Sequence, residues 1–154
     1  MKNSTHTQKG FTLIEVLVVI GILAILATIV IVAVNPARQF AQSRNTQRTA
    51  NVNAILNAVG ERIADNKGIF EKDCAAGQIP ASSTAVMASG SYDIGPCLVP
   101  TYLSSLPFDP SATGAHFTST GDYDTQYLIQ RDGTTGRITV SATAELGETI
   151  AITR

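Results

Sequence analysis

The chain has 154 residues, a formal net charge of −1 and 44% hydrophobic residues, with the longest apolar run near its beginning. About 90 residues remain after Asn66, enough for one small head that would be marginally stable alone. From Glu61 onward the chain carries 11 acidic against 6 basic residues, which argues against a strong general nucleic-acid binder.

The first predicted element is a membrane span. Residues Met1–Gly10 form a short, positively charged leader, and Phe11–Val34 form an apolar run of 24 residues with one charge, at Glu15. A helix of this length reaches about 36 Å, which crosses a hydrocarbon core of about 30 Å. The run is too long for a secretory signal peptide, and Ile29–Val34 offers no small-residue cleavage site, so we expect the span to stay with the mature protein.

Glu15 is the most informative residue of this span. An ionised carboxylate in lipid costs roughly 2.5–3.5 kcal/mol, so an intramembrane Glu is by default functional and needs a partner. If the chain is cut after Gly10, Phe11 gains an α-amine four residues before Glu15, on the same face of a helix and at the same membrane depth. Cleavage would therefore supply the missing positive charge.

Residues Lys9–Ile20, with the sequence KGFTLIEVLVVI, resemble the N-terminal signature of type IV pilins and the pseudopilins of type II secretion. The resemblance implies that a prepilin peptidase cuts after Gly10 on the cytoplasmic side and methylates the new N-terminal residue, Phe11. It also implies that Glu15 acts in subunit assembly.

The expected architecture is α+β, with a long N-terminal helix packed against a small antiparallel β-sheet head, as in the pilin fold. We expect four parts: a leader at 1–10, a transmembrane and assembly half of the helix at 11–34, an amphipathic half at 35–66, and a head at 67–154. Pro36 predicts a bend or local melting where the helix leaves the membrane, and Gly68 is the predicted helix stop.

The second half of the helix carries one apolar face at three- and four-residue spacing, formed by Val52, Ile55, Leu56, Val59 and Ile63. This face is the predicted core contact. The preceding stretch, Gln42–Asn51, is polar all round. We therefore expect that no side of it packs against the head of its own subunit, and that it is either exposed to solvent or covered by neighbouring subunits.

The charges are split along the chain. No acidic residue lies between Asn35 and Gly60, a stretch that contains Arg38, Arg44 and Arg48. The basic stem either meets acidic faces of adjacent subunits or is an ordinary solvated helix.

Five prolines exclude long helices from the middle of the head. The clearest strands are Gln126–Arg131 and Arg137–Ala142, joined by a glycine-bearing hairpin turn, followed by Glu148–Thr153. Three strands laid on an amphipathic helix make a stable unit, whereas a lone hairpin would not.

Cys74 and Cys97 enclose 22 residues, and we expect a disulfide there, worth about 3–4 kcal/mol. Buried thiols, or metal ligation joined by His116, are the alternatives. A disulfide suits an oxidising compartment beyond the membrane, and on this we rest the orientation, because charge counting alone would favour the opposite one.

Metal and catalytic sites have little support. Asp109, Asp122 and Asp124 are weak calcium candidates, since the resembling pseudopilins hold calcium in this region, but turn aspartates explain the pattern equally well. The sequence contains no nucleophile elbow, no second mature histidine and no nucleotide-binding loop. We therefore expect no enzymatic activity and no cofactor.

The expected function is a structural, major pilin-like subunit that polymerises with itself into a helical type IV pilus. Its other partners would be the prepilin peptidase, the assembly platform and motor, and the cytoplasmic membrane, which it crosses once before assembly into an extracellular pilus or a periplasmic pseudopilus. A pseudopilin is the alternative, because Leu106–Pro110 with Tyr123 and Tyr127 loosely resembles the major pseudopilin head. A membrane-anchored binding domain that never polymerises is a further one.

Overall fold

The structure, a computed structural model, describes residues 10–81 and 84–154. Of the predicted leader, only Gly10 falls within the described residues. The chain forms two compact units, Met1–Gln39 and Phe40–Arg154. Each unit is described by itself.

The first unit contains α1, Leu13–Val34. Thr12 is its N-cap: its backbone is extended, and its hydroxyl accepts the N–H of Glu15 at 3.3 Å. A capping hydroxyl satisfies one of the amides that a helix start leaves free. Because the helix starts after this cap, Phe11 precedes it in the uncut chain. That Phe11 and Glu15 share one helix face was expected for the chain cut after Gly10, and it stays a prediction.

A single residue interrupts the helix where Pro36 predicts a break. Asn35 has a φ of 46°, and α2, Pro36–Asp65, begins directly after it. The side-chain oxygen of Asn35 accepts the N–H of Arg38 at 3.3 Å, so Asn35 ends one helix and caps the next. Proline is well suited to the first position of a helix, where its missing N–H has no partner to lose.

The helix α2 ends near the predicted stop. After Asp65 the chain turns through Lys67 and Gly68, both at positive φ, and the Gly68 N–H donates to the carbonyl of Ile63 at 2.8 Å. A glycine in the left-handed region commonly closes a helix in this way.

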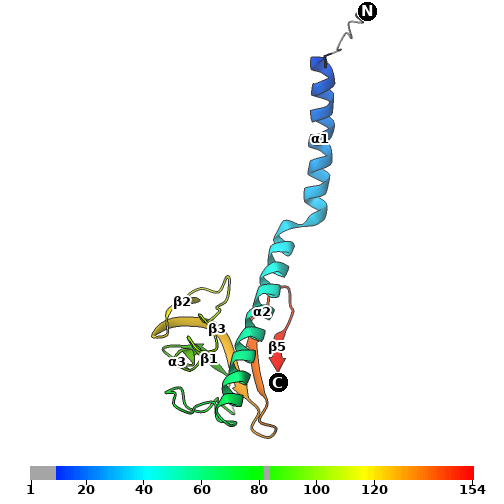
Figure 1. Ribbon diagram of the computed structural model, residues 1–154. Helices are drawn as coiled ribbons and strands as arrows, with labels where there is room; N and C mark the ends of the chain where they lie inside the picture. The colour runs from blue at the N-terminus through cyan, green and yellow to red at the C-terminus, as the bar shows by residue number, and fades with distance from the viewer. Residues whose placement is uncertain (1–9, 82–83) are drawn as a thin grey trace, which may run out of the picture. The chain divides into compact units, whose positions relative to one another are not determined.

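The second unit contains one antiparallel sheet of five strands, drawn in Figure 1. The strands are β1 Ala85–Ala88, β2 His116–Ser119, β3 Asp122–Arg131, β4 Ile138–Ala142 and β5 Ile150–Thr153. Strand β3 is central: β1 pairs with one edge, and β4 followed by β5 extends the other. The three predicted strands are present as β3, β4 and β5, whereas β1, β2 and the short helix α3, Gly95–Leu98, were not predicted.

The core lies between α2 and the sheet, and Figure 1 shows α2 running alongside the strands. The predicted apolar face is confirmed: Val52, Ile55, Leu56 and Val59 are buried, and Ile63 packs partly buried against the same cluster. The sheet contributes fully buried side chains to this core, including Tyr127, Ile129 and Val140.

The polar stretch of α2 contradicts its prediction. Asn45 and Arg48 are only 4% and 3% exposed, so this part of the helix does bury a stripe in its own head. The apolar periodicity could not reveal this, because the stripe is polar and its partners are carboxylates of distant loops. Arg48 is therefore neither solvated nor free to pair with an adjacent subunit, the two surroundings that the sequence suggested.

Candidate assembly site and its supporting head

The Glu15 carboxylate is the candidate assembly group. Residues Gly10, Phe11, Thr12 and Glu15 line one open surface hollow, so Phe11 stays next to Glu15 although it precedes the helix. No residue of α1 is buried, and Phe11 and Leu13 are each 83% exposed. Removal of residues 1–10 would place a new α-amine beside this carboxylate.

The helix around Glu15 is long and apolar enough to cross a membrane. Its Thr28 hydroxyl is satisfied locally, since it donates to the carbonyl of Ala24 at 2.9 Å. An apolar surface exposed on all sides needs lipid or other helices around it.

An ion-pair cluster, buried at Arg48 and Asp109 and partly exposed at Arg44 and Glu145, ties the beginning of α2 to the head. Arg48 donates from Nε to Asp109 at 2.7 Å and from Nη2 to the other Asp109 oxygen at 3.0 Å, while its Nη1 reaches Glu145 at 2.8 Å. Arg44 binds Glu145 with two further hydrogen bonds, at 2.7 and 2.6 Å. Bidentate, charge-assisted bonds of this kind are the strongest that side chains make.

Asn45 completes the cluster. Its amide nitrogen donates to the Glu145 carbonyl at 2.9 Å and to the Glu148 carboxylate at 2.8 Å, and its oxygen accepts the Glu145 N–H at 3.0 Å. Among the described residues, no buried side-chain nitrogen or oxygen is left without a hydrogen-bond partner. A fully satisfied network holds a single arrangement, here of α2 against the loops that contain Asp109 and Glu145.

The cluster lowers the pKa values of its carboxyls. Burial alone would raise the pKa of Asp109, but the hydrogen bond from Arg48, helped by the Ser111 and Ala112 amides, holds it below its ordinary value. Hydrogen bonds from Arg44 and then Arg48 lower the pKa of Glu145 to about 2. Both carboxyls are therefore ionised at neutral pH.

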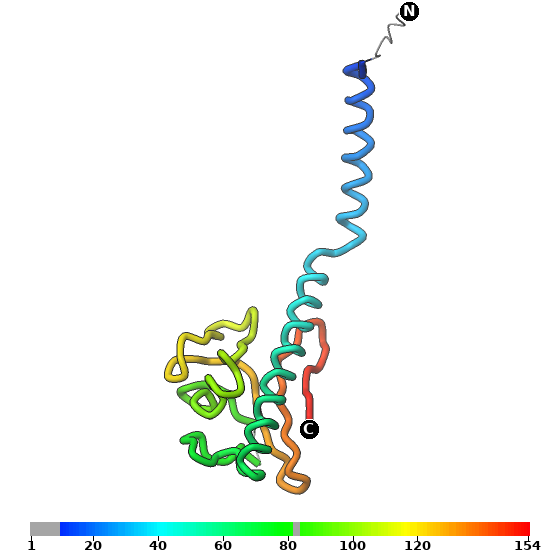
Figure 2. Tube along the Cα trace, viewed as in Figure 1, coloured from blue at the N-terminus to red at the C-terminus, as the bar shows by residue number. Residues whose placement is uncertain are grey.

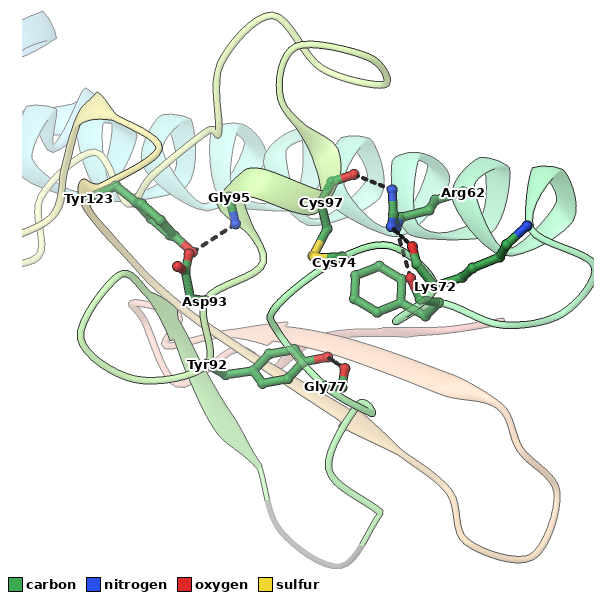
Figure 3. The surroundings of a disulfide bond; sticks show 10 residues. Arg62, Lys72, Cys74, Gly77, Tyr92, Asp93, Gly95, Cys97 and Tyr123 are labelled. Carbon is green, nitrogen blue, oxygen red and sulfur yellow. Dashed lines mark hydrogen bonds between the residues drawn. A yellow bond between two sulfur atoms is a disulfide. The ribbon is translucent and has the colours of Figure 1, made fainter.

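The two cysteines form a disulfide, with their Cα atoms 5.5 Å apart, as expected, and this excludes the alternative of free thiols or metal ligands. Figure 3 shows Arg62 of α2 beside the Cys74–Cys97 disulfide. Its guanidinium donates to the carbonyls of Phe70 and Cys97, each at 2.8 Å, and to that of Lys72. The end of α2 thus holds the segment that leads into Cys74 and the carbonyl of Cys97, on the two sides of the disulfide.

Tyr123 packs the same loop against β3. Its hydroxyl donates to Asp93 at 2.7 Å and accepts the Gly95 N–H at 2.9 Å (Figure 3). Burial, followed by the bond to Asp93, raises the pKa of Tyr123 above its ordinary value. A Cβ on Gly95 would lie 2.6 Å from the Tyr123 ring, so this close approach requires glycine.

The weak calcium candidates are each bound to protein groups. Asp109 accepts from Arg48, Asp122 lies 3.1 Å from the His116 ring, and Asp124 accepts from Gln126 at 2.8 Å. Within residues 10–81 and 84–154, no three acidic, histidine or cysteine side chains gather as a metal site would require. Asp109 and Asp122 are thus each paired with a basic side chain, and Asp124 with an amide.

Sequence reasoning missed the supporting residues of the head. Asn45, Arg48 and Arg62 are buried polar residues of α2, and only their partners reveal their role. One signal was available: Arg48 is four residues before Val52, the first residue of the predicted core face, and therefore lies on the same side of the helix.

Comparison with known proteins identifies the N-terminal segment. Residues 5–31 match the prokaryotic N-terminal methylation motif, the hallmark of type IV pilins, pseudopilins and related prepilin-like proteins. No curated protein and no solved structure matches the chain. The resemblance noted at Lys9–Ile20 is thus confirmed, and the long apolar helix followed by an antiparallel sheet is consistent with the pilin fold.

The motif has general consequences. It supports a pilin-like or pseudopilin protein, and such proteins are structural subunits and not enzymes. It implies processing by a prepilin peptidase and polymerisation. Together with the apolar helix, it suggests anchoring in the membrane before assembly.

Proposed function

We propose that the chain is a structural subunit of a type IV pilus, cut after Gly10, methylated at Phe11 and polymerised through α1. The observation that carries this proposal is Glu15, the one carboxylate of an apolar helix that lies within the matched motif and buries none of its residues. The subunit waits as a single-pass protein of the cytoplasmic membrane and ends in an extracellular filament.

The assembly contact joins two subunits. The α-amine of Phe11 on one subunit pairs with Glu15 of a neighbour, and because each subunit offers its amine to one neighbour and its carboxylate to another, the contact is head-to-tail, does not close on itself and propagates. A buried charge without a partner is strongly destabilising, so the pair also fixes the axial register of the helices.

Extraction from the membrane costs little free energy, because α1 exchanges one apolar surrounding for another. In lipid, its exposed apolar side chains contact acyl chains; in the filament they contact the α1 helices of other subunits, and lipid tails are about as apolar as leucine. The assembly platform and motor, which are separate proteins, supply the work.

The head suits the outside of a fibre. Its disulfide is compatible with an oxidising compartment, and the Arg48 cluster fastens α2 to the loops around it. A pseudopilin of type II secretion is the second candidate, favoured by the Leu106–Pro110 resemblance. The engagement of Asp109 by Arg48 weakens that alternative, because Asp109 is one of the candidate calcium ligands.

The test compares Glu15→Ala with Thr28→Ala, which removes a polar group from the same helix without changing its charge. We expect Glu15→Ala to be inserted and cleaved normally but to be absent from sheared surface filaments, while Thr28→Ala assembles. Normal filaments from Glu15→Ala would overturn the assembly role and favour a membrane-anchored domain that never polymerises. Filaments confined to the periplasm would favour the pseudopilin.

A further inference from the structure

An exposed apolar group marks the end of the head where α2 begins. Phe40 is 65% exposed, and Leu146, in the loop between β4 and β5, is 49% exposed. Leu146 also has a φ of 60°, a left-handed conformation that a bulky residue rarely adopts. Its neighbour Glu145 is held by Arg44, Asn45 and Arg48, so the cluster presents Leu146 to solvent in a fixed position.

A cavity of about 280 Å³ lies at the other end of α2. The turn after α2, the segment at Gln78 and Ile79, and the β3–β4 hairpin line it, and its apolar lining includes Ile63, Ile69, Phe70, Ile79 and Ile138. Ile69 is 48% exposed. The volume is just below the range of about 300–1,000 Å³ for small-molecule pockets, and one or two side chains would fill it. Glu71, Gln78 and Arg131 make the rest of its lining polar.

The two features lie at opposite ends of one rigid unit. Asn45, which binds the Leu146 loop, and Ile63, which lines the cavity, are 18 residues apart on α2, or about 27 Å along a helix. Figures 1 and 2 show the β4–β5 connection beside the first turns of the head's α2 and the β3–β4 hairpin beside its last turns.

The charges at the two ends are complementary. Glu148, two residues after Leu146, is exposed, and among the described residues its side chain accepts one hydrogen bond, from the amide of Asn45. Arg131 lines the cavity and is exposed, and within the described part of the chain no carboxylate lies at ion-pair distance from it. Glu71 also lines the cavity, and Arg131 is the basic residue of its lining, so Arg131 is the group with which an incoming carboxylate would pair.

We propose that Leu146 of one copy of this chain inserts into the Ile69 cavity of the next copy, with Glu148 of the first copy pairing with Arg131 of the second. The contact joins two different surfaces, so it is head-to-tail and extends without closing. It rests on the proposed filament function and adds to the Phe11–Glu15 contact a second one, between heads. The charge pair orients the docking, and the buried leucine supplies the apolar contact.

Cysteine cross-linking of the full chain in assembled filaments tests the contact. A chain with both Leu146→Cys and Ile69→Cys should give, on oxidation, a ladder of linked subunits, and a mixture of the two single variants should give dimers only. The control pairs Leu146→Cys with Ser119→Cys, which lies on exposed β2, and should give no ladder. Filaments that form without the predicted cross-links would overturn the proposal.

Charge reversal gives an independent test. Glu148→Arg and Arg131→Glu should each lower the filament yield several-fold without affecting membrane insertion or cleavage, and the double variant should recover it, because like charges at a contact repel. Failure of the double variant to recover, or full assembly of both single variants, would contradict the contact. If the unaltered chain forms no filaments, the proposed function fails instead, so the two failures are distinguishable.

Discussion

Arg48 and Asp109, 61 positions apart in the chain, form a bidentate ion pair in which both side chains are less than 5% exposed. This pair makes the beginning of the head's α2 part of the folded core. The polar stretch around Arg48 is therefore a structural part of its own subunit, and it is not free to act as a basic surface.

Breaking this pair should destabilise the head strongly. Arg48→Ala leaves the Asp109 carboxylate buried without its partner, and removal of one member of a buried pair typically costs roughly 3 kcal/mol or more. Denaturant unfolding of the detergent-solubilised full chain, followed by circular dichroism, measures the loss. Arg44→Ala, whose side chain is 35% exposed, is the control and should cost much less; equal losses would contradict the central role of Arg48.

Acid should destabilise the head through the same cluster. The folded pKa of Glu145, about 2, is lower than its ordinary value of 4.5. Between these two pH values the unfolded chain binds more protons than the folded chain, so the stability of the head falls as the pH drops. The contribution of Glu145 is fully present above pH 4.5 and is lost between 4.5 and about 2. Thermal unfolding across this window should show a shallower pH dependence for Glu145→Gln; an unchanged slope would exclude this origin.

The disulfide should contribute stability that reduction removes. The Cys74–Cys97 bond spans a sequence separation of 23 residues, for which loop-closure entropy gives about 3 kcal/mol. Replacing both cysteines by serine should lower the unfolding free energy by about that amount. The same variant should be insensitive to added reductant, unlike the unaltered chain, and a reductant effect that persists would point to another cause.

Gly95→Ala should destabilise the head by about 1–3 kcal/mol, the usual effect of overpacking, because the added Cβ meets the buried Tyr123 ring. The matched control is Gly90→Ala, where a Cβ would meet no atom within 4 Å. Chemical denaturation of both variants measures the difference. Similar stability for the two would show that the Tyr123 ring adjusts freely.

The sequence predicted the elements that carry a periodic apolar signal. The α2 core face from Val52 to Val59 and the hairpin of β3 and β4 repeat at the spacing of a helix and of strands. Strands β1 and β2 were missed because each has four residues, too few to show a period, and because both are defined by pairing with β3.

The site was predictable only in its local part. Glu15 stands out because a charge interrupts an apolar run, and no folding is needed to see it. The Arg48–Asp109 pair and the contacts of Arg62 with the disulfide loop join residues distant in sequence, and polar residues show no pattern that distinguishes a buried pair from a solvated surface. The cap at Thr12 likewise decides where α1 begins, which periodicity leaves open.

The most direct test of the filament proposal is the intact mass of the protein recovered from sheared cell-surface material, with and without reductant. The account predicts a chain that has lost residues 1–10 and carries one added methyl group, with a gain of two hydrogens on reduction of Cys74–Cys97. A full-length, unmethylated chain found only in membranes would contradict it.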